Sequence, residues 1–276
     1  MPKPVIGFIG LGLMGGNMVE NLQTRGFELV VMDLNKDAVA TVIDRGNARE
    51  AASPKDLAEA SNIVMLCLTT SEVVEKIVCG DSGILAGIKA GTVLIDFGTS
   101  IPASTRKIRA DLAAKDGLLN IMAAGDKATF DKVNPVLDEQ GENVFHLGAL
   151  GVGHTTKLIN NFIGMTTISA MSQAFDVTSR AGVDRKQLHE IMSTGPSNSP
   201  FMGFCKTYAV DGVSDLGFSI NNANKGLGYF LKMVEDLGTR SEIAEGTSHN
   251  LQAAIEAGLG NGNVPEILDY FAKLET

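Results

Sequence analysis

The first half of the chain alternates short apolar runs, rich in β-branched residues, with stretches of helical periodicity. This alternation is typical of a parallel sheet with helices on both faces. The runs predicted as strands cover residues 5–9, 28–32, 63–68, 92–96, 118–123 and 143–147. Ser53-Pro54 and the stretch from Thr99 to Pro102 are predicted helix starts, because a hydroxyl can cap a helix and proline suits its first turn. The sequence therefore predicts an α/β domain with a doubly wound sheet.

From about residue 151 onward, long helical patterns replace the strand-like runs. The longest covers residues 155–180, which are mostly apolar and contain no proline and one interior glycine, Gly164. A helix of this kind needs apolar neighbours on nearly every side, so we expect a second subunit to cover part of it in a homodimer or homotetramer. Further helices are predicted at residues 184–193, 200–210, 222–236, 242–257 and 265–274. We therefore predict two domains, residues 1–150 and an all-helical domain of residues 151–276, bridged by the long helix.

Composition excludes several classes of protein. The 276 residues are 44% hydrophobic and carry a formal net charge of -9, which suits a globular core and has the wrong sign for binding nucleic acid. No apolar run reaches the ~18 residues of a membrane span, and the N-terminus lacks the apolar region of a signal peptide. Three cysteines cannot all pair and are predicted to be free and reduced. We expect a soluble, cytoplasmic protein without a nucleic-acid or membrane partner.

A glycine-rich motif, Gly10-Leu11-Gly12-Leu13-Met14-Gly15, follows the first predicted strand directly and opens a helix. Its glycines would let backbone N–H groups at the helix start meet a pyrophosphate without a clashing Cβ atom. Asp33 follows the second strand, where a carboxylate can accept the ribose hydroxyls of an adenosine and would repel a 2′-phosphate. Leu68 and Thr69 end a further strand at the same carboxyl edge. The sequence predicts a Rossmann-type site that prefers NAD to NADP, although nearby Lys36 leaves NADP open.

Three further motifs follow in order along the chain. They are Asp96-Phe97-Gly98-Thr99-Ser100-Ile101-Pro102, Gly151-Val152-Gly153-His154-Thr155-Thr156-Lys157-Leu158-Ile159-Asn160-Asn161 and Asn224-Lys225-Gly226-Leu227-Gly228. With the glycine-rich motif, they resemble the signatures of the β-hydroxyacid dehydrogenase family, which includes 3-hydroxyisobutyrate, tartronate-semialdehyde, γ-hydroxybutyrate and sulfolactaldehyde reductases. The resemblance covers essentially the whole chain. It implies that Thr99 contacts the nicotinamide and that Lys225 approaches the cofactor or the substrate.

Lys157 is the predicted catalytic residue. Hydride transfer to an aldehyde produces an alkoxide, which needs a general acid within hydrogen-bond reach. Lys157 lies inside a long buried helix, where desolvation should lower the pKa of its amine. Asn161, four residues later on the same helix face, can orient the ammonium or the substrate oxygen. Ser197 is a predicted substrate contact, and Asn160 is predicted either to contact the substrate or to pack within the protein. The histidines lack metal-ligand spacing, so no metal site is predicted. His154 lies three residues before Lys157 and could approach the site, although solvation at the helix start is the favoured expectation.

The chain departs from the family pattern in three places. Gly98 replaces a serine, and Gly226 replaces the aspartate of the K-D-L motif. Near Asp116, a strand and substrate loop of about twenty residues are absent, which predicts a gap in the sheet beside residues 118–123. Either the segment is deleted, or the sequence omits a loop that the protein carries.

The sequence therefore predicts an NAD-dependent oxidoreductase that interconverts a small anionic β-hydroxyacid and its semialdehyde or aldehyde. Two alternatives stay open. A true deletion near Asp116 would favour a non-catalytic NAD-binding protein. An imine reductase shares the architecture, although it usually departs from lysine at the position of Lys157.

Overall fold

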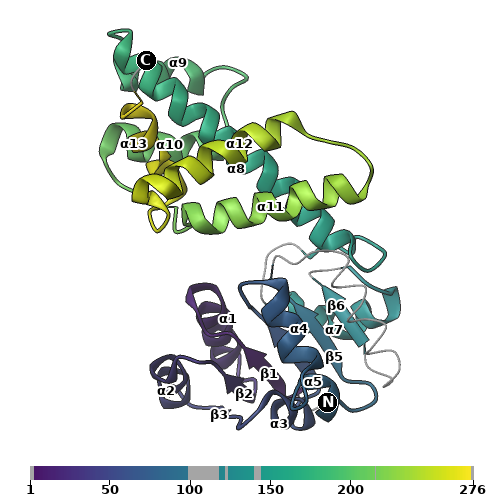
Figure 1. Cartoon of the computed structure of the whole chain (residues 1–276). Helices are drawn as coiled ribbons and strands as arrows, with labels where there is room; N and C mark the ends of the chain where they lie inside the picture. Colours follow the sequence, from purple (N-terminus) through teal and green to yellow (C-terminus); the bar gives the residue numbers. More distant parts are fainter. Residues whose placement is uncertain (1–2, 99–117, 122–123, 140–143, 215, 275–276) are drawn as a thin grey trace. The chain divides into compact units, whose positions relative to one another are not determined.

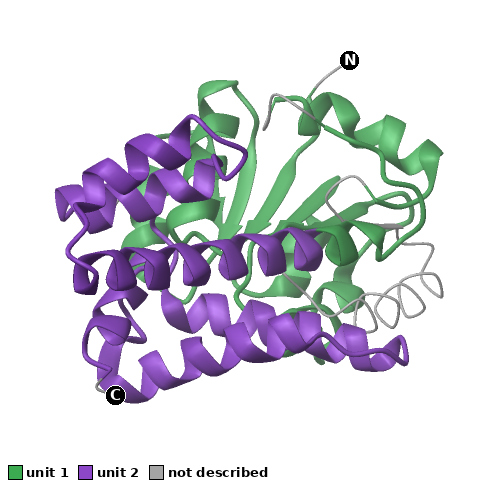
Figure 2. Cartoon of the chain, turned by 90° about the horizontal axis from the view of Figure 1, so that it is seen from above, with its two compact units in different colours: residues 1–156 green, residues 157–276 purple. Residues whose placement is uncertain are grey.

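The structure is a computed structural model of the 276-residue chain, and it describes residues 3–98, 118–121, 124–139, 144–214 and 216–274. It divides into two compact units, residues 1–156 and residues 157–276 (Figure 2). The segment around Asp116, where the sequence predicts missing residues, lies outside the described residues. No helix among the described residues is long and apolar enough to cross a membrane.

The first unit is built on a parallel sheet whose described strands have the order β3-β2-β1-β4-β5-β6 (Figure 1). Its strands are β1 (Ile6–Ile9), β2 (Leu29–Met32), β3 (Ala48–Glu50), β4 (Ile63–Leu66), β5 (Val93–Asp96) and β6 (Leu118–Ile121). The register pairs Ile6 of β1 with Leu29 on one side and Ile63 on the other. The order reverses at β1, which is the doubly wound α/β arrangement that the sequence predicts.

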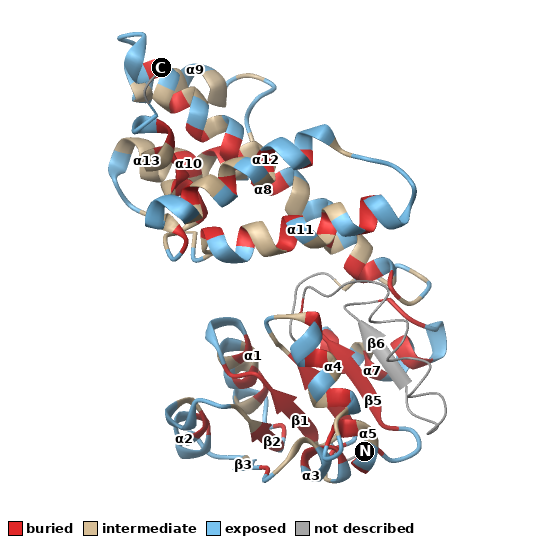
Figure 3. Cartoon of the chain, in the orientation of Figure 1, coloured by how far each residue is buried: buried red, intermediate tan, exposed pale blue. Residues whose placement is uncertain are grey.

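Helices cover both faces of this sheet. They are α1 (Leu13–Thr24), α2 (Lys36–Asp44), α3 (Pro54–Glu59), α4 (Ser71–Cys79), α5 (Ile84–Gly87) and α7 (Lys127–Leu137). Alternate residues along a strand point to opposite faces, so Phe8 packs in the cluster of α1, α2 and α7 while Ile9 packs in that of α3, α4 and α5. The strands β1, β4 and β5 are buried throughout (Figure 3), as expected for a sheet covered on both sides.

Some local predictions are corrected by the structure. Residues 144–147 form no strand, and the short strand β3 was not predicted. The expected gap in the sheet is also wrong, because β6 pairs directly with β5 in parallel, with Leu118 opposite Val93. Ser53 caps α3 as predicted, accepting a hydrogen bond from the N–H of Asp56. The predicted helix start at Thr99 lies outside the described residues.

The second unit is helical throughout its described elements. These are α8 (Val152–Arg180), which begins within the first unit, followed by α9 (Arg185–Ser193), α10 (Pro200–Asp211), α11 (Ile220–Asp236), α12 (Glu242–Ala254) and α13 (Leu268–Ala272), with a π-helical turn at Ile255–Leu259 and a 3₁₀ turn at Val264–Ile267 between the last two. The apolar residues of α8, α11 and α12 share one core. Gly164 allows α8 and α10 to approach, since a Cβ atom there would lie 2.7 Å from the ring of Phe201.

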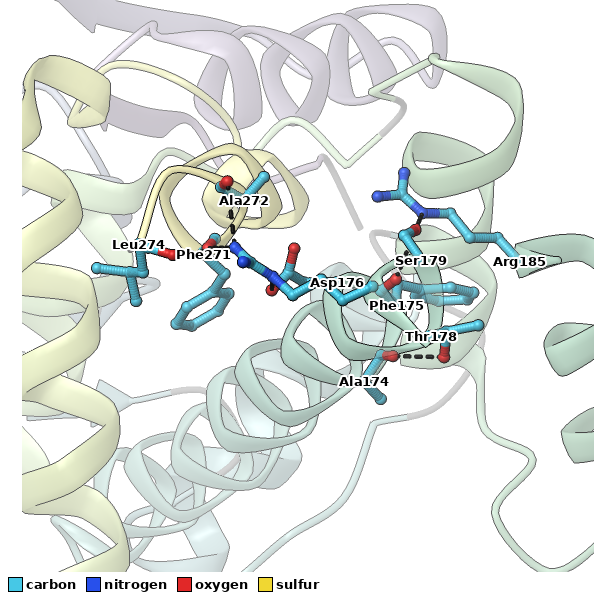
Figure 4. Close-up of polar contacts among 10 residues, drawn as sticks. Ala174, Phe175, Asp176, Thr178, Ser179, Arg185, Phe271, Ala272 and Leu274 are labelled. Atoms are coloured by element: carbon cyan, nitrogen blue, oxygen red, sulfur yellow. Dashed lines mark hydrogen bonds and ion pairs between the residues drawn. The ribbon is translucent and has the colours of Figure 1, made fainter. Parts of the chain in front are cut away.

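Arg180 ties the end of α8 to the C-terminal segment of this unit. Its Nη2 donates hydrogen bonds to the carbonyl oxygens of Phe271, Ala272 and Leu274 at 3.0–3.3 Å, and its Nε lies 2.8 Å from Asp176 (Figure 4). The last carbonyl groups of a helix have no partner within the helix, so a guanidinium that meets several of them stabilises the end of α13.

Candidate functional site

Two glycines of the glycine-rich motif are required by the backbone of the first unit. Gly10 has a φ of +101°, and a Cβ atom there would lie 2.3 Å from the carbonyl oxygen of Cys67. A Cβ atom at Gly15 would lie 1.9 Å from the carbonyl oxygen of Gly10. These contacts make the tight turn between β1 and α1 possible, so both positions have a structural role whether or not a ligand binds.

Gly12 is different, because a Cβ atom there would meet nothing within 4 Å. Gly12 precedes α1, whose start has no side-chain cap, whereas α2, α3 and α4 are capped by Asn35, Ser53 and Thr70. The first N–H groups of a helix need partners and attract anions. Leu13 and Met14 are exposed beside this start. Open space and an uncapped helix start in a G-x-G-x-x-G motif fit the pyrophosphate of a dinucleotide.

Asp33 lies immediately after β2 and faces the same loop. Its Oδ2 accepts a hydrogen bond from the N–H of Leu11 at 2.5 Å, and its Oδ1 accepts one from Asn35 at 2.7 Å. The carboxylate is thus held beside the glycine-rich turn, where the ribose of a nucleotide on that turn would come. Lys36, whose positive charge could bind the 2′-phosphate of NADP, forms an ion pair with Glu50.

The end of β4 forms another part of the same sheet edge. Leu68 is half-buried and Thr69 is exposed, and the carbonyl oxygen of Cys67 is in close contact with Gly10. Burial and the nearby Asp96 carboxylate raise the pKa of the Cys67 thiol, so this cysteine is not activated as a nucleophile. Thr70 caps α4 with its hydroxyl.

Lys157 is a half-buried lysine in the first turns of α8, and burial lowers the pKa of its amine. Among the residues that the structure describes, no carboxylate or other polar group pairs with it. Asn161 follows at the helical spacing that places both on one face and is also half-buried. A Cβ atom at Gly226 would lie 3.4 Å from Asn161 Nδ2, so the structure brings Asn161 of α8 next to α11. A lysine without a counter-charge and with a lowered pKa is suited to transfer a proton.

The other predicted site residues are less constrained. Asn160 and Ser197 are exposed, and Lys225 is half-buried on α11 beside Gly226. Thr99 lies outside the described residues. No group of three or more metal-ligating side chains occurs in the described parts of the chain.

The structure corrects the expectation for His154. The side chain is not solvated but buried, with 1% exposure, and its Nε2 lies 3.1 Å from the carbonyl oxygen of Gly98 and 3.6 Å from Oδ2 of Asp96. Burial lowers the pKa of the imidazole, against the opposing effects of Asp96 and the Gly98 carbonyl. Asp96 and His154 belong to two different sequence motifs, and neither motif indicates that the two side chains lie close together.

Comparison with protein families divides the chain at the same place as the motifs. Residues 5–117 and 110–148 match the family described as the NAD binding domain of 6-phosphogluconate dehydrogenase. Residues 151–271 match the family described as NAD-binding of NADP-dependent 3-hydroxyisobutyrate dehydrogenase. The first match comes in two pieces that meet near Asp116, where the sequence predicts a missing segment.

Individual relatives cover most of the chain. The human mitochondrial 3-hydroxyisobutyrate dehydrogenase is 32% identical over 265 residues, 89% of this chain and 77% of that protein. The 2-(hydroxymethyl)glutarate dehydrogenase of Eubacterium barkeri is 27% identical and covers 98% of this chain and 95% of its own length. The Mycobacterium tuberculosis 3-hydroxyisobutyrate dehydrogenase has a similar fold, with a TM-score of 0.88 at 22% identity over 98% of this chain and 99% of that one.

Proposed function

The chain belongs to the β-hydroxyacid dehydrogenase family, and from this premise we propose that it is an NAD-dependent oxidoreductase acting on a small anionic β-hydroxyacid and its semialdehyde or aldehyde. The observation that carries the proposal is Lys157, a half-buried amine with a lowered pKa and no partner among the described residues. Residues 1–150 would bind the dinucleotide, and residues 151–276 would contribute substrate contacts and the subunit interface.

Each of the proposed residues has a separate role in the reaction. A bound nicotinamide supplies or accepts the hydride at its C4 atom. The uncapped start of α1 at Gly12 would hold the pyrophosphate, and Asp33 the ribose hydroxyls. In reduction, the ammonium of Lys157 would donate a proton from Nζ to the carbonyl oxygen as negative charge develops on it; in oxidation, the neutral amine would take the hydroxyl proton. Asn161 would orient that oxygen without adding charge.

The preference for NAD over NADP rests on Asp33. A carboxylate fixed by Leu11 and Asn35 would repel a 2′-phosphate, and Lys36 is engaged by Glu50. A solved relative that binds NADP⁺ has the same fold at 18% identity, so the fold alone does not decide the cofactor. We expect Asp33→Ser to narrow the ratio of kcat/KM for NADH over NADPH by about tenfold or more. An unchanged ratio would contradict the role of Asp33.

The central experiment is Lys157→Ala. We expect kcat to fall by about two to four orders of magnitude, the usual contribution of a general acid, while the Kd of NADH changes little. Lys186→Ala is a matched control, because Lys186 is an exposed lysine on α9, and it should keep wild-type turnover. The assay would use NADH with glyoxylate, succinic semialdehyde and the aldehyde of 3-hydroxyisobutyrate, since names of relatives include these compounds. Near-normal turnover in Lys157→Ala would refute the assignment.

A second candidate, a non-catalytic NAD-binding protein, is favoured by the divided family match near Asp116. It predicts NADH binding by the wild-type chain without turnover of any small hydroxyacid or aldehyde. An imine reductase from Myxococcus stipitatus has the fold, with a TM-score of 0.65 at 18% identity over 98% of this chain and all of that one, but Lys157 favours carbonyl chemistry. Competition between cyclic imines and semialdehydes for NADH oxidation would separate the two.

We also propose a homodimer or homotetramer. Several apolar side chains of α8, among them Ile159, Ile163 and Val177, are exposed in the single chain, and such residues are usually covered when they gather on one helix. Light scattering coupled to gel filtration would give the mass of the assembly. A monomer at micromolar concentration would contradict the proposal.

A further inference from the structure

A buried polar contact joins the end of β5 to the first turn of α8, and both partners belong to the first unit. His154 and Asp96 are 1% and 3% exposed. Nε2 of His154 lies 3.1 Å from the Gly98 carbonyl oxygen and 3.6 Å from Asp96 Oδ2, and Asp96 Oδ1 accepts the N–H of Gly98 at 2.8 Å. The proposed reaction gives none of these three residues a task.

The Gly98 carbonyl identifies the nitrogen that carries the proton. A carbonyl oxygen is an acceptor, so Nε2 at 3.1 Å from it is the donor, while Asp96 Oδ2 at 3.6 Å lies beyond hydrogen-bond distance. Burial lowers the pKa of the His154 imidazole and so favours the neutral ring, with its proton on Nε2. In this state the ring donates to Gly98, and it adds no positive charge three residues before Lys157.

The turn that receives this hydrogen bond is tight. A Cβ atom at Gly98 would lie 2.9 Å from Asp96 Oδ1 and 3.1 Å from the Leu68 carbonyl oxygen. A side chain there would displace the carboxylate that holds the Gly98 N–H. Asp96 accepts a hydrogen bond from the N–H of Gly98, and His154 donates one to its carbonyl oxygen. Together these two bonds fix the direction of the Gly98 carbonyl.

We propose that His154 is a positioning residue for the reaction: its Nε2–H holds the first turn of α8 on the turn after β5, so that Lys157 acts from a fixed place. Lys157 follows one helical turn later, about 4.5 Å along the axis. Helix ends fray when nothing holds them, and a small displacement of a reacting group can lower a rate by up to about a hundredfold. The inference rests on the proposed role of Lys157.

Two amide variants test the hydrogen bond. In His154→Gln, the side-chain nitrogen is four bonds from Cα, like Nε2 of histidine, and can still donate to Gly98. In His154→Asn, it is one bond shorter and falls short of the carbonyl. We expect His154→Asn to lower kcat by about ten- to a hundredfold with the Kd of NADH unchanged, and His154→Gln to recover most of kcat. His249→Asn, at an exposed histidine on α12, should match the wild type.

A merely structural role would lower the melting temperature in His154→Asn but leave kcat of the folded protein unchanged, and that result would overturn the inference. Equal loss in both amide variants would overturn it as well, because the donated hydrogen bond would then be irrelevant. Hydrogen exchange gives a readout that does not need turnover: amides of residues 155–158 should exchange faster in His154→Asn than in His154→Gln. If Lys157→Ala keeps its activity, the proposed function fails, and equal exchange in the two His154 variants would still overturn the anchoring itself.

Discussion

Gly12 is the glycine of the glycine-rich motif at which a substitution should affect ligand binding without affecting folding. A Cβ atom at Gly12 has no neighbour within 4 Å, whereas one at Gly15 would lie 1.9 Å from the carbonyl oxygen of Gly10. Gly12→Ala should therefore change the free energy of unfolding by less than about 1 kcal/mol, the scale of an N-cap exchange. Gly15→Ala must move backbone and should cost more than about 3 kcal/mol.

Gly12→Ala should also weaken dinucleotide binding. The added methyl group would stand where a phosphate approaches the uncapped start of α1, and losing one hydrogen bond to a charged group costs about 1.5–3 kcal/mol. Since 1.4 kcal/mol corresponds to a factor of ten, the Kd of NADH should rise by about ten- to 150-fold.

The assay is a titration in which the change of NADH fluorescence on binding gives the Kd of each variant. Urea unfolding followed by circular dichroism gives the stability of each variant. If the Gly12→Ala variant folds and binds NADH with the wild-type Kd, the proposed placement of the pyrophosphate is refuted. A large loss of stability in Gly12→Ala would refute the open space seen around this glycine.

Other predictions concern pH and packing. Because burial lowers the pKa of Lys157 below 10.5, carbonyl reduction should slow as pH rises through that lowered value and alcohol oxidation should speed up, and flat pH–rate profiles in both directions would contradict this. The same burial disfavours the charged amine in the folded state, so urea unfolding at pH 7 should find Lys157→Met more stable than the wild type. Arg180→Ala should lower the free energy of unfolding by about 1–3 kcal/mol, whereas Arg240→Ala, whose ion pair is exposed, should change it by less than about 1 kcal/mol. Gly164→Ala should destabilise, because overpacking against Phe201 costs about 1–3 kcal/mol and exceeds the helix gain of about 1 kcal/mol; Gly246→Ala, which has open space, should stabilise instead.

Much of the first unit could be predicted because its strands lie between two apolar faces. The runs around Phe8 and Met65 are buried on both sides, so their composition alone indicates strands. The strand β3 carries Arg49 and Glu50 at an edge, where no apolar pattern is needed, and sequence periodicity misses it. Residues 144–147 have a strand-like composition but pair with no neighbouring strand, and Phe145 is exposed.

Candidate site residues could be proposed from the sequence where a structural or chemical role favours one residue type. Glycines at a tight turn, a carboxylate after β2 and a lysine four residues before an asparagine each leave a readable pattern. The His154 contact could not be read in this way, because its acceptor is the backbone carbonyl of Gly98, 56 residues away. Any residue type supplies a carbonyl, so no signal in the sequence marks the partner.

Because β6 pairs directly with β5, we expect that dinucleotide binding and turnover can be tested separately in this chain. The parallel order from β3 to β6 is complete among the described strands, and the parts proposed to hold the nucleotide, Gly12 and Asp33, lie after β1 and β2, away from that edge of the sheet. A deletion near Asp116 would therefore leave the sheet that supports Gly12 and Asp33 intact. Its effect should fall on the substrate, so binding of NADH is expected under either proposed function, and only turnover distinguishes them.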